Sequence, residues 1–396
     1  MICKQKYICA SGLTMQCQQV LLFFDGNIAN DGIMTAYKSR ISALLGDDLD
    51  AILLFNGSEE SSNFLYMTGF NSGVFEDTPL LLLKDRMVIF SSILEYSTAV
   101  SQASKQGGIS VEKMTGREEI VSSIRKFTHG KIVGFDGEYL PFGTYMHLKA
   151  LAKPKSAVNV SERFGALRRI KNADEIRYMK EAVRIVKSAF YSIPQYFGVG
   201  MTEKELSARF NYLMEEAGAD AQSFKTIVCF GKNSAMPHHS PDQTRLKANS
   251  FILIDAGAKY NNYCSDMTRT FIYKPEKGSV KHRRMLDMYD TVKEAQRLAL
   301  EGVKPGVSGS SIHKIAQSYI DSAKGGIYRG RFIHSLGHSI GIDVHDDSRV
   351  GFSPSVKAKL EAGMVISDEP GIYIDGFGGV RLEDDVLIEK NGATFL

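Results

Sequence analysis

The sequence has no long apolar run, little excess charge and no closely spaced pair of cysteines. Its longest apolar stretches, 20–24 and 79–83, are far shorter than the roughly 20 residues that span a membrane, and the first is too short for a signal peptide. The 48 Lys and Arg against 45 Asp and Glu give a net charge of +3, which offers no broad surface for nucleic acid. The five cysteines are scattered without C-x-x-C, as in proteins of a reducing compartment. We therefore expect a cytoplasmic protein with neither a membrane nor a nucleic-acid partner.

The length of 396 residues exceeds one ordinary hydrophobic core, so we expect two domains. Residues 1–33 fit neither domain and are predicted to form an N-terminal extension. From 34 to 160, helix-like and strand-like segments alternate, which is typical of an α/β domain with a mixed sheet, and no phosphate-binding glycine loop occurs there. A long, charged helical stretch follows at 163–193, and the pattern over 161–396 predicts an α+β catalytic domain with acidic residues on its strands.

Two strand-turn-strand patterns in the second domain place acidic residues symmetrically about a turn. The midpoint between Asp255 and Asp266 falls between Tyr260 and Asn261, inside the turn KYNNY, and Glu369 and Glu383 are equidistant from Gly376. In symmetric hairpins each pair would face across the strands, about 5 Å apart, which is unfavourable unless a positive charge lies between them. A single acid at a strand end is usually a turn or cap residue, but two such hairpins with a histidine-rich segment predict a paired divalent-metal site.

The histidine-rich segment at 331–346 also contains G-x-S-x-G, the nucleophile pattern of serine hydrolases, with Ser339 at its centre. Such a hydrolase needs an acid and then a histidine well downstream of the serine, yet the last histidine of the chain is His345. Ser339 is therefore predicted to be incidental, and the histidines of this segment are better candidates for the chemistry.

Four segments, in this order, resemble the metal-binding motifs of the "pita-bread" metallopeptidases: ILIDAGAKYNNYCSD, HSLGHSIGIDVHD, SDEPGIYI and GGVRLED. That family includes prolidase, aminopeptidase P, methionine aminopeptidase and creatinase. The resemblance implies a pita-bread catalytic domain preceded by a creatinase/prolidase-like N-terminal domain. It implies a site for two divalent cations that share a hydroxide, with Asp255, Asp266, His338, Glu369 and Glu383 as ligands. Glu369 would also accept a proton from the attacking water.

The same resemblance assigns roles to further residues. His238, in the segment ending Pro-His, would assist at the scissile nitrogen, and His345 would stabilise the carbonyl oxygen as it becomes negative. His334 would line the substrate pocket, and Arg381 would hold a metal ligand in place. Arg349 matches the arginine with which prolidases bind the free carboxylate of a dipeptide, a task that suits a guanidinium. His239 has no counterpart and is predicted to be structural.

The preceding domain and the complete ligand set favour prolidase and aminopeptidase P over the other members. We expect hydrolysis of Xaa-Pro dipeptides, with removal of the first residue from longer Xaa-Pro peptides as the alternative. A metal-free, peptide-binding relative of the same fold is the alternative of another class; a phosphoesterase is disfavoured because no basic phosphate-binding cluster occurs. Oxygen-rich ligation suits Mn²⁺ or Co²⁺ first, with Zn²⁺ or Fe²⁺ as alternatives. The resemblance also implies a homodimer.

Overall fold

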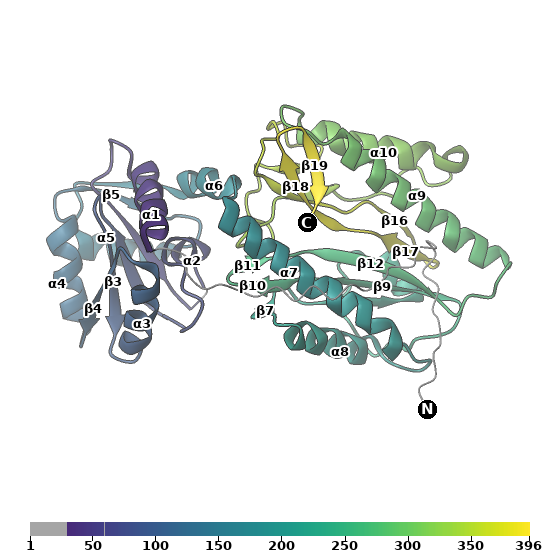
Figure 1. Ribbon diagram of the computed structural model, residues 1–396, viewed down its shortest axis with the longest axis horizontal. Helices are drawn as coiled ribbons and strands as arrows, with labels where there is room; N and C mark the ends of the chain where they lie inside the picture. Colours follow the sequence, from purple (N-terminus) through teal and green to yellow (C-terminus); the bar gives the residue numbers. More distant parts are fainter. Residues whose placement is uncertain (1–29, 59) are drawn as a thin grey trace.

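The structure is a computed structural model that describes residues 30–58 and 60–396. It shows two domains side by side along the long axis, with the smaller, N-terminal one on the left of Figure 1. The predicted extension over 1–33 lies outside the described residues except for 30–33, which belong to the first turn of α1 (Asn30–Leu45). No described helix has the length and apolar character needed to cross a membrane.

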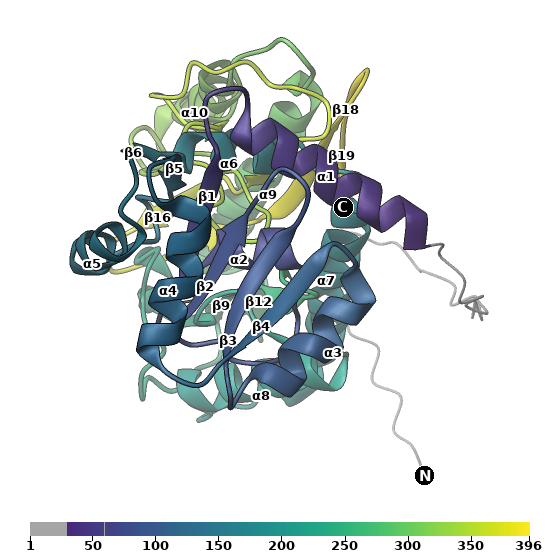
Figure 2. The ribbon, with the colours of Figure 1, turned by 90° about the vertical axis from the view of Figure 1, so that its left-hand side faces the viewer.

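The N-terminal domain is built on a six-stranded mixed sheet with strand order β4-β3-β2-β1-β5-β6. β1 is antiparallel to β2 and parallel to β5, so both kinds of pairing meet at the central strand. The described helices α1 to α5 surround this sheet (Figure 2). The strands are β1 (Ala51–Asn56), β2 (Thr78–Leu82), β3 (Met87–Ser92), β4 (Ile109–Met114), β5 (Ile132–Phe135) and β6 (Ser156–Asn159), and the remaining helices are α2 (Ser62–Thr68), α3 (Tyr96–Gln106), α4 (Arg117–Thr128) and α5 (Phe142–Ala152).

The central strand β1 is apolar on both faces because helices cover both sides of the sheet. Ile52 and Leu54 join one buried cluster, and Ala51 and Leu53 join another on the opposite face. This explains the run AILLF, in which apolar residues follow one another without alternation. The prediction of an α/β domain with a mixed sheet is confirmed.

Two helices, rather than the single helical stretch expected at 163–193, connect the domains. α6 (Ser161–Arg169) ends before Asn172, and α7 (Ala173–Ser192) begins after it. The Asn172 side chain accepts hydrogen bonds from the first turn of α7, and the Glu175 carboxylate accepts one from the Asn172 backbone N–H. This capping box starts a new helix at Asn172, and its N-x-x-E signature is visible in the sequence.

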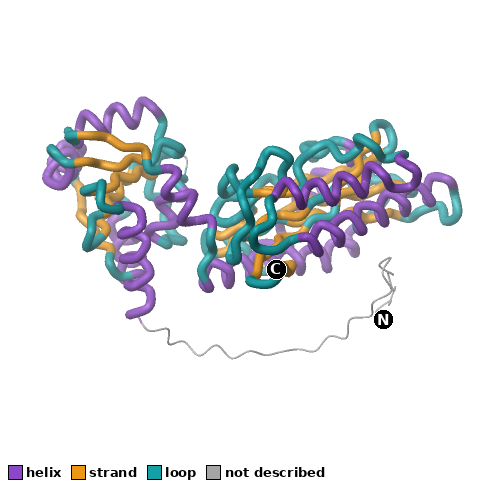
Figure 3. The backbone as a smooth tube through the Cα atoms, turned by 90° about the horizontal axis from the view of Figure 1, so that it is seen from above, coloured by secondary structure: helices purple, strands orange, loops and turns teal. Residues whose placement is uncertain are grey.

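The second domain places its strands between two pairs of helices, as the views of Figures 1 and 3 show. α7 and α8 (Glu203–Glu216) pack on β8 and β9, and α9 (Val280–Gly302) and α10 (Gly309–Gly326) pack on the C-terminal strands. The predicted α+β class is confirmed. The strands are β7 (Ala221–Gln222), β8 (Ile227–Phe230), β9 (Ser250–Ala256), β10 (Ala258–Tyr260), β11 (Tyr263–Cys264), β12 (Met267–Tyr273), β13 (Gly337–His338), β14 (Gly351–Phe352), β15 (Val365–Asp368), β16 (Gly371–Ile374), β17 (Gly378–Arg381), β18 (Asp384–Glu389) and β19 (Gly392–Phe395), and the 3₁₀ turns are η1 (Ile193–Tyr196) and η2 (Gly231–Ala235).

Candidate active site

The first acidic hairpin, β9 to β12, differs from the predicted register. Asp255 lies opposite Thr268, two residues beyond Asp266, so the expectation that the two aspartates face each other is wrong. The turn is centred on Asn261 and Asn262, which both have positive φ (49° and 72°), as a two-residue type I′ turn requires. Because the partner of Asp255 lies two residues beyond Asp266, both carboxylates remain on the same face of the hairpin, as diagonal neighbours.

The second acidic hairpin has the predicted register. Asp368 pairs with Asp384 on one side, and Gly371 pairs with Arg381 on the other. Glu369 and Glu383 therefore occupy facing positions in the gap between β15–β18 and β16–β17, as predicted from their symmetry about Gly376.

The imidazole of His338 comes from a third segment, the short strand β13. Its Nε2 lies 3.6 Å from an Asp266 carboxylate oxygen and 3.6 Å from a Glu369 carboxylate oxygen. One ligand atom each of Asp266, His338 and Glu383 lie within 4.8 Å of one another. β13 approaches β15 so closely that a Cβ on Gly337 would lie 1.7 Å from the carbonyl oxygen of Ser367, so glycine is required next to His338.

Burial and mutual repulsion perturb the carboxylates of this cluster. Burial, reinforced by the neighbouring carboxylates, raises the pKa of Asp266 and of Glu383 well above their ordinary values. Burial also raises the pKa of Glu369 to about 8, even though Arg381 acts against it. One carboxylate oxygen each of Asp255 and Asp266 is buried without a hydrogen-bond partner. The four carboxylates outweigh the positive charge of Arg381, which binds Asp255, so this set of carboxylates with an imidazole fits divalent cations.

The guanidinium of Arg381 contacts this cluster. Its Nη2 donates to Asp255 Oδ2 at 2.5 Å, its Nε donates to the Thr268 hydroxyl at 3.0 Å, and its Nη1 donates to the Tyr373 hydroxyl at 2.9 Å. The Thr268 hydroxyl in turn donates to Glu383 Oε2 at 2.6 Å. Arg381 thus lies where it orients Asp255 directly and Glu383 through Thr268.

Sequence reasoning missed Thr268 and Tyr373. Thr268 could have been found from the correct hairpin register, since it faces Asp255 across the strands. No local sequence pattern indicates Tyr373, because the contact of its hydroxyl with His334 Nε2 (2.8 Å) exists only in the folded chain.

The carboxylate cluster opens into a cavity of about 850 Å³. The predicted histidines His238, His334 and His345 all line it, together with the five predicted metal ligands and Arg381. Burial, helped by Arg381, lowers the pKa of His334 to about 4, and burial with the nearby His345 lowers that of His338 to about 4. These imidazoles are therefore neutral near pH 7, as metal ligation at His338 requires.

Arg349 is the predicted site residue that does not line the cavity, although its neighbours Ser348 and Val350 do. Its Nε donates to Asp347 Oδ1 at 2.8 Å, and its Nη1 lies 3.6 Å from Glu162 of α6. These two carboxylates hold the guanidinium against the helix that links the domains.

Ser339 and His239, which the sequence predicted to be incidental and structural, make hydrogen bonds within the protein. Both hydrogen bonds of the Ser339 hydroxyl are made with the backbone of Asp347. The His239 ring lies 2.8 Å from the buried Glu203 carboxylate, which also accepts from the backbone of Phe230 and Asp242.

Comparison with known proteins agrees with this architecture. Residues 177–390 match the model of metallopeptidase family M24, and residues 40–170 match that of the creatinase/prolidase N-terminal domain. The chain is 33% identical to the Xaa-Pro dipeptidase of Pyrococcus horikoshii over 91% of this chain and 95% of that protein. The structure is similar to the Xaa-Pro dipeptidase from Bacillus anthracis, with a TM-score of 0.80, 29% identity, and coverage of 91% of this chain and 97% of that one. The X-Pro aminopeptidase from Thermotoga maritima gives a TM-score of 0.79 at 27% identity, covering 90% and 97%.

The family match covers more than half of the chain and includes every carboxylate and imidazole of the cluster described above. Because the relative from Pyrococcus horikoshii matches along nearly its whole length, the likeness extends to both domains. The chain belongs to metallopeptidase family M24 and is an enzyme with the pita-bread catalytic fold.

Proposed function

We propose that this enzyme hydrolyses the Xaa-Pro bond of dipeptides in a reaction that depends on divalent metal ions. The observation that carries the proposal is the convergence of four carboxylates and one imidazole at a cavity that three further histidines line. The similarity to Xaa-Pro dipeptidases supports the choice of substrate. The buried free thiols of Cys229 and Cys264 are compatible with the reducing cytoplasm, which we propose as its compartment.

The residues that would hold two divalent cations are Asp255, Asp266, His338, Glu369 and Glu383. We propose Mn²⁺ or Co²⁺, with Zn²⁺ or Fe²⁺ as alternatives, because the ligand set has many oxygens and one nitrogen. The chemistry that such cations supply is polarisation of a carbonyl oxygen and activation of water near neutral pH.

The remaining side chains have tasks that suit their positions in the cavity. Glu369, whose carboxylate lies 3.6 Å from His338 Nε2 in the cluster, would accept the proton of the attacking water and release it later. His345 and His238 reach the cavity from different segments, as stabilisation of the carbonyl oxygen and assistance at the nitrogen require. His334, held by the Tyr373 hydroxyl, would form a wall of the substrate pocket.

The purified protein with Mn²⁺ should release free proline from Ala-Pro and leave Ala-Pro-Ala intact, as measured by chromatography of the products. Release of Ala and Pro-Ala from the tripeptide, with the dipeptide spared, would instead establish an aminopeptidase P. The volume of the cavity favours this second candidate, because about 850 Å³ is near the upper end of small-ligand pockets. No cleavage of either peptide with any divalent metal would identify a peptide-binding module.

We propose that the Arg349 guanidinium, which in this structure binds Asp347 outside the cavity lining, turns to the carboxylate of a bound dipeptide. Arg349→Ala should then raise KM for Ala-Pro about tenfold to a hundredfold, while KM for Ala-Pro amide stays unchanged. A lost hydrogen bond to a charged group is worth about 1.5–3 kcal/mol, and only the free dipeptide offers a carboxylate. Arg169→Ala is the matched control, since Arg169 also donates to Asp347, at 3.0 Å. Equal KM changes for Ala-Pro and its amide would show that Arg349 does not bind the substrate carboxylate and only contacts Asp347 and α6.

We also propose a homodimer, as the family resemblance implies. Val74, Ile93 and Leu94 are apolar and exposed on the N-terminal domain, where a second subunit could cover them. Light scattering coupled to size-exclusion chromatography measures the subunit number directly.

A further inference from the structure

The N-terminal domain contributes no residue to the lining of the large cavity in the described part of the chain. It nevertheless contacts the segment between β13 and β14, which carries His345. The Tyr139 hydroxyl, from the loop after β5, donates to the Asp343 carboxylate. The Ser62 hydroxyl, at the start of α2, donates to the same carboxylate. Two donors from the first domain therefore meet one acceptor two residues before His345.

The other end of this segment is fixed by Asp346, whose side chain is only 1% exposed. Its carboxylate accepts from Arg168 of α6 and from Lys171, whose Nζ lies 3.2 Å away. Burial alone would raise the pKa of Asp346, but Lys171 and Arg168 lower it below its ordinary value, so the carboxylate stays charged.

Arg168 joins the two ends of the segment and the first domain. Its guanidinium donates to Asp343 and to Asp346, and its Nη1 donates to Asn63 Oδ1 at 2.8 Å. Asn63 in turn donates to the buried Asp136 at 2.6 Å. The network thus extends from the N-terminal sheet to both residues that flank Val344 and His345.

The His345 ring has little else to fix it in this structure. It packs against the ring of His338, with centroids 4.1 Å apart at 45°, and it faces the cavity. A displacement of Asp343 would therefore move His345 relative to the metal cluster, and a shift of about 1 Å can cost roughly a hundredfold in rate.

We propose that Tyr139 is a positioning residue for catalysis: through its bond to Asp343 it fixes His345, so the docked N-terminal domain sets the geometry of a site that it does not line. The inference rests on the proposed role of His345 in Xaa-Pro hydrolysis. Ser62 assists Tyr139, and Arg168 transmits the effect to the far end of the segment.

The test is a double-mutant cycle of Tyr139→Phe and His345→Ala, assayed on Ala-Pro with Mn²⁺. Tyr139→Phe keeps the ring and should lower kcat about threefold to thirtyfold, with KM changed less than roughly twofold. In the His345→Ala background the same substitution should have no further effect on kcat. An equal loss of kcat in both backgrounds, or no loss in either, would overturn the proposal.

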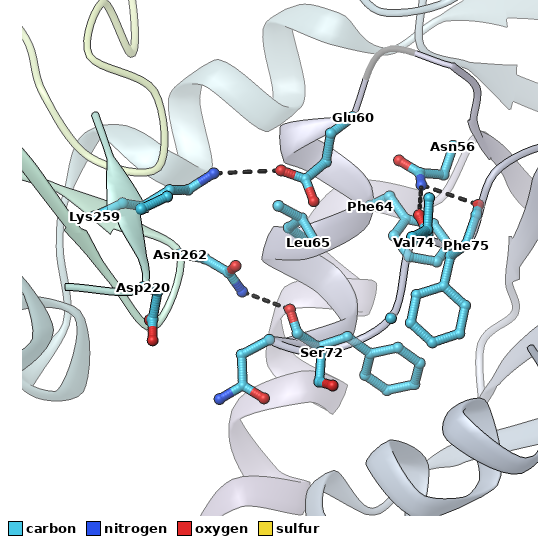
Figure 4. A pocket seen from close by; sticks show the side chains of 14 residues that line it. Asn56, Glu60, Phe64, Leu65, Ser72, Val74, Phe75, Asp220, Lys259 and Asn262 are labelled. Carbon is cyan, nitrogen blue, oxygen red and sulfur yellow. Dashed lines mark hydrogen bonds and ion pairs between the residues drawn. The ribbon is translucent and has the colours of Figure 1, made fainter. Parts of the chain in front are cut away.

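Two controls separate positioning from a general weakening of the domain interface. Figure 4 shows another contact between the domains, where Lys259 of β10 meets Glu60 at 3.3 Å and Asn262 donates to the Phe70 carbonyl. Lys259→Met should leave kcat unchanged, because the ion pair with Glu60 that it breaks involves neither Asp343 nor a side chain hydrogen-bonded to Asp343. Tyr145→Phe, on α5, removes a hydroxyl of the same domain that is not part of the network and should also be silent.

A readout without catalysis keeps the test independent of the substrate. In metal-free protein labelled with ¹⁵N-histidine, the ring signals of His345 are identified by their loss in His345→Ala. Tyr139→Phe and Ser62→Ala should each shift or broaden these signals and leave those of His129, in the N-terminal domain, unmoved. Inactivity of the wild type on every Xaa-Pro peptide would refute the proposed function, whereas unmoved His345 signals in both variants would refute the positioning role.

Discussion

Glu383→Gln should lower kcat at least about a thousandfold and yet make the metal-free protein more stable. The substitution removes one of the charges that would hold the divalent cations, and loss of one group that stabilises a developing charge typically costs 10²–10³ in rate or more. In the absence of metal, the same carboxylate is buried among Glu369 and Asp255, which with burial raise its pKa. Gln is neutral without taking up a proton, so the variant avoids the cost of protonating this carboxyl group on folding at pH 8. We therefore expect the metal-free variant to melt about 2–4 °C higher, equivalent to roughly 1 kcal/mol.

The opposite signs distinguish a metal ligand from an ordinary buried acid. A Gln side chain still accepts the hydrogen bond that Thr268 donates to Glu383 Oε2, so packing is preserved. Glu361→Gln, at an exposed position, is the matched control and should change neither quantity. If Glu383→Gln lowered the melting temperature of the metal-free protein and kept most of the activity, the assignment of Glu383 as a ligand would be wrong.

The ligand cluster was predictable to the extent that hairpin symmetry determines which residues face one another. The turn at Gly376 is symmetric, so Glu369 and Glu383 were placed correctly. The turn at KYNNY was centred one residue too early, because its two asparagines adopt positive φ and form the turn themselves. Asparagine tolerates that conformation better than most residues, so an Asn-Asn pair is the signal that gives the correct register and brings Thr268 opposite Asp255.

Contacts between residues far apart in the chain could not be predicted in this way. The break between α6 and α7 has a local capping signature, but the burial of Arg168 among Asn63, Asp343 and Asp346 has none. The contact of Arg349 with Glu162, nearly two hundred residues away in the chain, likewise has no local signature. Periodicity and turn chemistry report on single elements, whereas these contacts depend on how the two domains dock.

The stabilisation by Mn²⁺ should increase between pH 6.5 and pH 8. In the metal-free protein the pKa of Glu369 is raised from 4.5 to about 8, and that of Asp385 to about 8, chiefly by burial. A raised pKa means that the folded state binds protons that the unfolded state releases, so the free energy of unfolding falls as pH rises towards 8. The pKa values of His334 and His338 are lowered to about 4, so these residues reduce the free energy of unfolding only as pH falls below their ordinary pKa of 6.5. They do not contribute to its change between pH 6.5 and pH 8.

Bound cations require the deprotonated carboxylates, so their effect on stability has the opposite dependence on pH. At a hundred times the dissociation constant each site adds about 2.7 kcal/mol, and two sites should raise the melting temperature of the catalytic domain by roughly 10–20 °C at pH 8. Thermal unfolding followed by circular dichroism, with Mn²⁺ or with EDTA at pH 6.5 and pH 8, measures the difference. An equal shift at both pH values would mean that the cations do not compete with protons for this cluster, and in Glu383→Gln the shift at pH 8 should be strongly reduced.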